Sequence, residues 1–294
     1  MKAPTKVPTK ETSRNKSEFA EIRLATSAGA SVGILAYGAH IISWRPASRK
    51  TEHLFVSERA LYQPGISIRG GVPVVFPQFA DRGPLAKHGF ARIQPWTLLS
   101  NAVLDDGRAQ AVLTLTSNDV TRALWPHDFA ATYKVTLSDD QLDMQLHIHN
   151  TGSQPFEFTA ALHTYLAVDD IRASQLHGLQ GSDFVQRGRE HRETESQEAL
   201  QFDAAIDRVY FNSNHNTKSP LTLVSPAQHT QLNARGFEDT VVWNPWVEGC
   251  ATADDMTNED YQAMLCVEAA SVANPIQLHT GESWTGGQTL MAKI

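Results

Sequence analysis

His163 is a residue of this 294-residue sequence that could exchange protons near neutral pH. It follows the apolar-rich run 156–162, and on a strand it would share a face with Thr159 and Tyr165. An imidazole has an ordinary pKa of about 6.5, so it can donate or accept a proton. A strand histidine can equally be a structural residue with satisfied hydrogen bonds, and the residue type alone leaves both interpretations open.

Glu268 lies at the end of a second apolar segment, in which Ala263, Leu265 and Val267 would share one strand face. A carboxyl group is costly to bury unless it is hydrogen-bonded, and burial would raise its pKa toward the range of a general base. The alternative is an exposed carboxylate at the end of a strand.

A shaped loop is expected between Ile68 and Arg92. The pair Gly70–Gly71 and the nearby prolines cannot lie in an ordinary central strand, and long shaped loops in compact domains are usually functional. Arg69, His88 and Arg92 supply hydrogen-bond donors here, and an arginine fork matches the oxygens of a phosphate or carboxylate. The arginines could instead pair with a local acid such as Asp81.

Two further residues fit a sugar. Asp207 can accept hydrogen bonds from hydroxyl groups, and Trp243 can form the flat wall on which a sugar ring lies. A buried tryptophan in the core is at least as common, so this interpretation needs support from the fold.

His147 and His149 would lie on one strand face and could form a metal pair. They lack a nearby carboxylate or cysteine at ligand spacing, so we predict no metal site. The Gly70–Gly71 pair lacks the spacing and the Lys-Ser/Thr ending of a phosphate-binding loop, and no Gly-x-Ser-x-Gly elbow is found. We therefore expect no nucleotide cofactor and no serine nucleophile.

The elements that must position these residues are strands. Apolar residues recur at period two, most clearly in a hairpin in which 133–137 and 142–148 alternate around the polar run 138–141. Further strands are expected over 31–37, 111–117, 156–165, 221–224, 240–243 and 261–268. Helical signals are sparse: 190–200 is too polar to bury a face, and 254–261 gives at most one turn. This pattern predicts an all-β protein, a large antiparallel sandwich or barrel.

Composition limits the function further. Residues 1–18 are expected to form a disordered arm and 19–294 a single domain. The formal net charge of −7 argues against nonspecific nucleic-acid binding, so an anionic ligand must be met by a few placed cations. Two cysteines form no disulfide framework, and no apolar run is long enough to span a membrane. We expect a cytoplasmic monomer whose partner is a small molecule.

Seven motifs in this order resemble the hexose-6-phosphate 1-epimerase branch of the aldose 1-epimerase (mutarotase) family. They are Ile68-Arg69-Gly70-Gly71-Val72-Pro73, Phe76-Pro77-Gln78-Phe79, His88-Gly89-Phe90-Ala91-Arg92, Leu162-His163-Thr164-Tyr165, Asp207-Arg208-Val209-Tyr210, Val242-Trp243-Asn244-Pro245-Trp246 and Cys266-Val267-Glu268. Each motif is weak by itself, but the order and spacing make the combination specific.

The resemblance implies an antiparallel β-sandwich of the galactose-mutarotase type with an open sugar cleft and no cofactor. It makes His163 the general acid and Glu268 the general base. It assigns His88 and Asp207 to sugar hydroxyls and Arg69 and Arg92 to a phosphate. Gln78 and Trp243 complete the expected substrate-binding set. Its members are Arg69, His88, Arg92, Asp207, Gln78 and Trp243. Ala80 stands where we expect glycine, which leaves the shape of the loop and the substrate preference open.

The expected reaction interconverts the α and β anomers of a hexose 6-phosphate, with glucose 6-phosphate as the expected substrate. Glu268, as carboxylate, would remove the O1 proton while His163, as imidazolium, protonates the ring oxygen O5. Mutual attraction would favour this ionised pair. The alternatives are a neutral-sugar aldose 1-epimerase, a catalytically silent sugar-binding sandwich, and a metal-dependent jelly-roll enzyme using His147 and His149.

Overall fold

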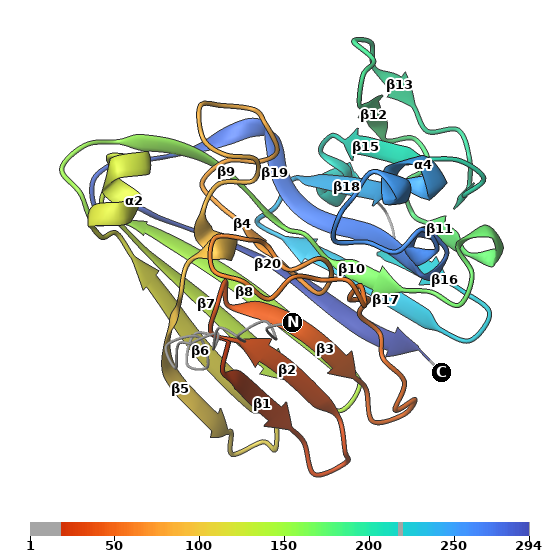
Figure 1. The fold of residues 1–294 in the computed structure, drawn as a ribbon, viewed down its shortest axis with the longest axis horizontal. Helices are drawn as coiled ribbons and strands as arrows, with labels where there is room; N and C mark the ends of the chain where they lie inside the picture. The colour runs from red at the N-terminus through yellow and green to blue at the C-terminus, as the bar shows by residue number, and fades with distance from the viewer. Residues whose placement is uncertain (1–18, 217–219, 294) are drawn as a thin grey trace, which may run out of the picture.

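The computed structural model describes residues 19–216 and 220–293, and antiparallel strands dominate it (Figure 1). The arm expected over residues 1–18 lies outside the described residues. Among the described residues the strands form three sheets. The smallest contains β1 (Glu21–Ala25), β2 (Ser31–Leu35) and β3 (His40–Arg45).

The sheet that carries most of the site has a central long strand, β19 (Met264–Leu278), and β10 (Tyr165–Ala167) also pairs with it. In spatial order the sheet contains β13 (Glu193–Thr194), β12 (Asp183–Gln186), β15 (Ile206–Tyr210), β18 (Asp239–Asn244), β19, β9 (Phe156–Leu162) and β4 (Val74–Val75).

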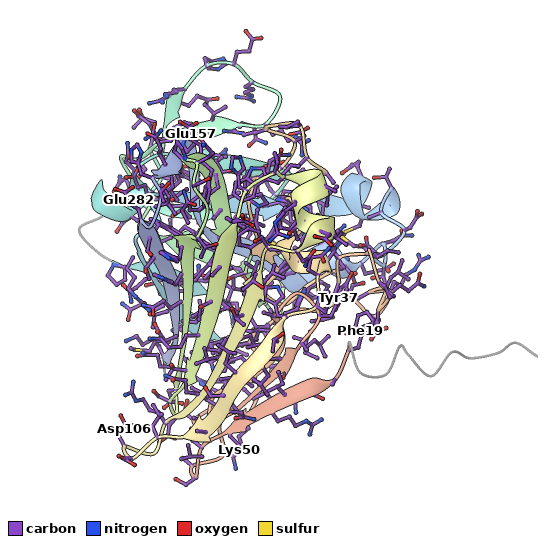
Figure 2. All side chains as sticks on the ribbon, turned by 90° about the vertical axis from the view of Figure 1, so that its left-hand side faces the viewer. Phe19, Tyr37, Lys50, Asp106, Glu157 and Glu282 are labelled. Atoms are coloured by element: carbon purple, nitrogen blue, oxygen red, sulfur yellow. The ribbon has the colours of Figure 1, made fainter. Side chains whose placement is uncertain are left out.

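The opposing sheet contains the longest hairpins. Its order is β14 (Ala199–Gln201), β11 (Gln175–His177), β16 (Leu221–Val224), β17 (His229–Arg235), β20 (Ser283–Lys293), β8 (Gln141–Asn150), β7 (Phe129–Leu137), β6 (Ala109–Thr116) and β5 (Thr97–Val103). Figure 2 shows its long strands running from the end with Lys50 and Asp106 to the end with Glu157 and Glu282.

Helices are short. They are α2 (Asp119–Leu124), α3 (Ser213–Asn216) and α4 (Trp246–Ala251), with the 3-10 helices η1 (Ala91–Ile93), η2 (Ile171–Ala173) and η3 (Asp260–Ala263). The Asn118 side chain accepts hydrogen bonds from the N–H groups of Val120 and Thr121, which starts α2. No helix of the described part is long and apolar enough to cross a membrane.

The period-two pattern explains how the core forms. In β8 the residues Leu142, Met144, Leu146 and Ile148 are completely buried, and the polar residues between them are partly exposed. Leu137 pairs with Leu142 across the turn, so the predicted hairpin is confirmed. The inward faces of the two large sheets meet in one apolar cluster, which includes Leu146 of β8, Phe158 of β9 and Val267 of β19. This arrangement confirms the predicted antiparallel sandwich.

Two expectations about elements were wrong in detail. The strand expected over 156–165 is interrupted at 163–164, between β9 and β10. The strand expected over 261–268 begins at Met264, because the chain first forms η3. The polar segment 190–200 contains no helix, in agreement with its composition, but only β13 and the start of β14. The first difference matters most, because the interruption contains His163.

Candidate active site

The loop after Ile68 is anchored on two other segments, and both glycines are required there. Gly70 and Gly71 have φ angles of +117° and +62°, which residues other than glycine rarely adopt. A Cβ atom at Gly71 would also collide with the carbonyl oxygen of Ile41. Instead the N–H of Gly71 donates to Phe55 O at 2.7 Å. This close backbone packing fixes the position of Arg69.

An open cavity of about 110 Å³ lies where this loop meets the sheet containing β19. Seven of the eight predicted site residues line it: Arg69, His88, Arg92, His163, Asp207, Trp243 and Glu268. The structure thus brings together segments from all seven motifs, since Phe79 also lines the cavity. Lys87, Tyr165 and Arg187 also line the cavity and were not assigned to the site from the sequence.

His163 and Glu268 face each other inside this cavity. His163 Nδ1 lies 3.4 Å from Glu268 Oε1, and the side chains are 9% and 2% exposed. Glu268 is therefore buried within β19 and is not an exposed strand-end carboxylate. Neither His163 Nδ1 nor Glu268 Oε2 has a hydrogen-bond partner among the described residues. Buried polar atoms are nearly always hydrogen-bonded, so these two atoms are available to bond a ligand in the cavity.

Burial sets the protonation of this pair. It raises the pKa of the Glu268 carboxyl well above its ordinary value, and the negative charge of Asp207 adds to the effect. Burial also lowers the pKa of His163 well below its ordinary value, as do His88 and the neighbouring cations. Both groups are therefore pushed toward their neutral forms by the protein itself, contrary to the expected ionised pair. The pair still holds one exchangeable proton.

The imidazole of His163 is held between aromatic rings. It stacks on Tyr165 with ring centres 4.7 Å apart and an interplanar angle of 10°. His88 and Trp243 meet it edge-on, at 5.4 and 6.1 Å. Trp243 is half-buried and lines the cavity, so it can form part of a wall for a sugar ring. The stacking leaves the His163 ring little freedom to rotate.

His88 has a defined tautomer. The backbone N–H of Ala80 donates to His88 Nδ1 at 3.2 Å, so Nδ1 must be the unprotonated acceptor. Burial, followed by the charges of Arg92 and Lys87, lowers the pKa of His88 to about 2. His88 is therefore neutral with its proton on Nε2, as a hydrogen-bond donor.

Arg69 does not pair with Asp81, the local acid considered above. Its Nε donates to Asp255 Oδ2 at 3.1 Å, and its Nη2 lies 3.1 Å from Asp255 Oδ1. Its Nη1 donates to the Tyr165 hydroxyl at 3.2 Å. The contact with Tyr165, followed by the charge of Asp255, raises the pKa of Arg69. Arg69 is thus a fixed cation linked to the ring that stacks on His163.

Of the four cationic side chains that line the described cavity, Arg92 and Lys87 have no acidic partner. Arg92 Nη2 donates to the carbonyl of Lys87 at 2.8 Å, and neither side chain forms an ion pair with a carboxylate of the described chain. Burial lowers the pKa of Arg92 to about 10, so it remains charged at neutral pH. Uncompensated positive charge in a concave site attracts an anion.

Asp81 and Asp207 pair with a different arginine. Arg187 Nη2 lies 3.4 Å from Asp81 Oδ2, and Arg187 Nη1 lies 3.6 Å from Asp207 Oδ2. The antiparallel pairing of β12 with β15 explains this meeting, because the N–H of Arg187 donates to Asp207 O at 2.7 Å. No local motif surrounds Arg187, so the sequence held no signal for it. Lys87, in contrast, adjoins the His88 motif.

Gln78 is the predicted substrate-binding residue that the structure does not place in the cavity lining. Its Nε2 donates to the carbonyls of Ala80 and Leu85, and its Oε1 accepts from the N–H of Leu85. These three bonds occupy the amide on both sides. In this structure Gln78 shapes the loop 80–86, which borders the cavity at Ala80.

Ala80 has a φ angle of +49°, in the left-handed region. This explains why glycine is expected at this position, since only glycine adopts that region without strain. The loop nevertheless closes, because the N–H of His88 donates to Ala80 O at 2.9 Å.

The two histidines considered as a metal pair, His147 and His149, contact hydroxyl groups of the neighbouring strand β20. His147 Nδ1 lies 2.9 Å from Thr285 Oγ1, and His149 Nδ1 lies 2.8 Å from Ser283 Oγ, both on the exposed face of β8. Within residues 19–216 and 220–293 no group of three or more His, Cys, Asp or Glu residues could hold a metal ion.

Comparison with known proteins gives consistent matches along the chain. The family model described as aldose 1-epimerase matches residues 20–290. A protein of Cenchrus ciliaris named "Putative glucose-6-phosphate 1-epimerase" is 33% identical over 269 residues, which is 88% of this chain and 80% of that protein.

Two solved structures show the same fold. A crystal structure from Salmonella typhimurium, described as a "putative mutarotase", has a TM-score of 0.81 at 27% identity and covers 90% of this chain and 87% of its own. The structure of a galactose mutarotase related enzyme from Lactobacillus acidophilus has a TM-score of 0.72 at 13% identity, with 94% and 98% coverage. The second match supports the fold alone.

Proposed function

This chain belongs to the aldose 1-epimerase family, and we propose that the isomerase acts on a hexose 6-phosphate, with glucose 6-phosphate as its substrate. Family membership gives the reaction, the exchange of α and β anomers of a sugar. The phosphate is our addition. It is supported by the name of the relative from Cenchrus ciliaris and by the charges of the cavity.

The observation that carries the proposal is the pair Lys87 and Arg92. Four cationic side chains line the described cavity, against the two acids Asp207 and Glu268. Arg69 and Arg187 are paired with acids, while Lys87 and Arg92 are not. In a protein with a formal net charge of −7, such an arrangement favours a ligand that brings its own negative charge. A neutral sugar would leave both cations uncompensated.

In the proposed reaction Glu268 removes the proton of the C1 hydroxyl while His163 protonates the ring oxygen O5. The C1–O5 bond breaks, O1 becomes the aldehyde oxygen, and rotation about C1–C2 presents the other face for ring closure. The two residues then exchange roles. The 3.4 Å separation of His163 Nδ1 and Glu268 Oε1 supports this, because both groups can reach oxygens on the same carbon.

Substrate binding is expected to change the protonation of the pair. Burial and the nearby cations oppose an imidazolium at His163. A phosphate dianion beside Lys87 and Arg92 would offset those cations, and sugar hydroxyls could donate to Glu268 Oε2, which has no partner among the described residues. The first change favours the imidazolium and the second favours the carboxylate, the two charged forms that the reaction needs.

The remaining parts of the proposal concern partners and location. His88 Nε2 and Asp207 would bind sugar hydroxyls, and the reaction needs no metal ion or nucleotide because it transfers only protons. We also propose a cytoplasmic protein, since Cys250 and Cys266 are buried free thiols.

Exchange spectroscopy tests the function directly. Purified protein is added to an equilibrium mixture of glucose 6-phosphate anomers, and exchange between their NMR signals is compared with that of glucose. We expect protein-dependent exchange that is faster for the phosphate. Equal or faster exchange of glucose would favour a neutral-sugar epimerase, and no exchange of either sugar would favour a silent binding protein.

A further inference from the structure

The catalytic pair sits at an interruption of the strand ladder. β9 pairs with β19 at Leu162 and Ala269, and β10 pairs with β19 at Tyr165 and Cys266. The same register places His163 opposite Glu268. Between the two strands, residues 163 and 164 belong to no strand.

The backbone N–H groups at this interruption point away from β19. His163 N donates to Pro73 O at 3.0 Å, and Tyr165 N donates to Gly71 O at 2.9 Å. Thr164 N donates back to Leu162 O at 2.9 Å. In the opposite direction, Val267 N donates to Thr164 O at 3.0 Å. The ladder is therefore weakened where the distance between His163 and Glu268 is set.

One side chain of the opposing sheet closes this gap. Gln288 of β20 donates from Nε2 to Val267 O at 3.0 Å, and its Oε1 accepts a hydrogen bond from Thr164 Oγ1. Thr164 directly follows His163, and Val267 directly precedes Glu268. Gln288 is thus bonded to the neighbour of each catalytic residue without lining the cavity.

The position is unusual for an amide. Gln288 is 2% exposed, and the next inward residues of its strand β20, Leu290 and Ala292, are apolar. Its partner Thr164 is fully buried. A buried amide is costly unless its hydrogen bonds are made, and an aliphatic residue would fill the same space without that cost. Buried polar groups can instead fix one arrangement of the chain.

We propose that Gln288 is a positioning residue: by joining Thr164 to Val267 it sets the spacing between His163 and Glu268. The inference rests on the proposed function, in which both residues must reach oxygens of one sugar carbon. Acid–base catalysis depends on such placement, and a shift of about 1 Å can cost about 100-fold in rate. Gln288 acts through its neighbours and touches no substrate.

The test separates positioning from stability. Gln288→Met keeps the side-chain volume and removes both hydrogen bonds. We expect kcat for anomer exchange to fall about 10–100-fold, with KM nearly unchanged because the cavity lining is intact. In the double variant Gln288→Met/Thr164→Val the orphaned hydroxyl is also removed, so Tm should recover in part while kcat stays low. Recovery of both Tm and kcat would overturn the proposal.

A conservative variant gives a second readout. In Gln288→Glu a protonated carboxyl can still donate to Val267 O and accept from Thr164 Oγ1, whereas a carboxylate cannot donate. Its kcat relative to that of the native protein should therefore rise as pH falls. A ratio that does not change with pH would contradict the proposed bonds.

Asn150→Leu is the matched control. Asn150 is equally buried and donates to the carbonyls of Gln154 and Leu278, but it does not line the cavity. We expect a loss of Tm similar to that of Gln288→Met, with kcat within twofold of the native value. If Asn150→Leu loses as much kcat as Gln288→Met, the effect is one of stability and the positioning role fails.

An NMR measurement separates this inference from the proposed function. Exchange by the native protein tests the function, whereas the imidazole signals of His163 report its surroundings without any substrate. Gln288→Met should shift these signals and Asn150→Leu should not. Unchanged His163 signals in folded Gln288→Met would overturn the positioning role even if the native protein is fully active.

Discussion

The guanidinium of Arg69 is bound in a fork by the carboxylate of Asp255, with both N–O distances 3.1 Å. Arginine has five N–H groups; two are used here and a third donates to Tyr165. One N–H on Nη1 and one on Nη2 remain for a ligand. The Nε–Nη2 fork of Arg69 is therefore occupied by Asp255, and Nη1 links the guanidinium to the ring that stacks on His163.

The first prediction concerns the proposed catalytic pair, His163 and Glu268. His163→Ala and Glu268→Gln each remove one proton-transfer group, so each should lower kcat for anomer exchange by about 10²–10⁴-fold. Exchange spectroscopy measures the rate, and thermal unfolding shows whether the fold is kept. A folded variant with near-native kcat would remove that residue from the mechanism.

The second prediction distinguishes the cations by their partners. Arg92→Ala and Lys87→Met should lower kcat/KM for glucose 6-phosphate by about 10–100-fold and should scarcely change any activity on glucose. Arg69→Ala should lower both activities, because it leaves Asp255 unpaired and frees the Tyr165 ring. This differs from what the family resemblance implies, because the resemblance assigns both Arg69 and Arg92 to the phosphate.

Arg108→Ala is the control for these variants. Arg108 is exposed and pairs with Asp106, which Figure 2 places at the end of the molecule opposite Glu157 and Glu282. It should change neither activity. If Arg92→Ala lowers activity on both sugars equally, the arginine is part of the scaffold and the substrate is not selected by its phosphate.

The third prediction is the direction of a titration. Burial favours the neutral imidazole and the neighbouring cations add to the effect, so His163 in the free protein should titrate well below its ordinary pKa of about 6.5. Lys87→Gln removes one of these charges and should therefore move the midpoint to higher pH. NMR of the His163 ring in both proteins gives the two midpoints, and a downward shift in the variant would contradict the electrostatic account.

The fourth prediction concerns Ala80 and its φ angle of +49°. Left-handed backbone costs an alanine about 1–2 kcal/mol, while the added freedom of glycine in the unfolded chain costs about 0.4–1 kcal/mol. Ala80→Gly should thus raise the free energy of unfolding by about 0.5–1 kcal/mol. Urea denaturation measures this change.

Ala102 provides the opposite case. It lies exposed in β5, away from left-handed backbone, so Ala102→Gly should lower the free energy of unfolding by about 0.5–1 kcal/mol. If both substitutions destabilise the protein, the left-handed backbone at residue 80 is not a source of strain.

The sequence by itself determined the sandwich and pointed to most of the residues that line the cavity. Period-two alternation is local, so the hairpin of β7 and β8 could be predicted together with its buried face. The seven motifs pointed to His163 and Glu268 because residue type and order are visible in one chain. Local pattern also located the loop around Gly70.

Only the tertiary structure decided how those residues are partnered. Asp255 reaches Arg69, Arg187 reaches Asp207 and Gln288 reaches Thr164 from segments that are distant in sequence or lack a motif. Protonation is decided in the same way, since the neutral forms favoured at His163 and Glu268 follow from burial and surrounding charge. Hydrogen bonds and electrostatic fields depend on the distance between groups in space, and that distance cannot be read from their separation along the chain.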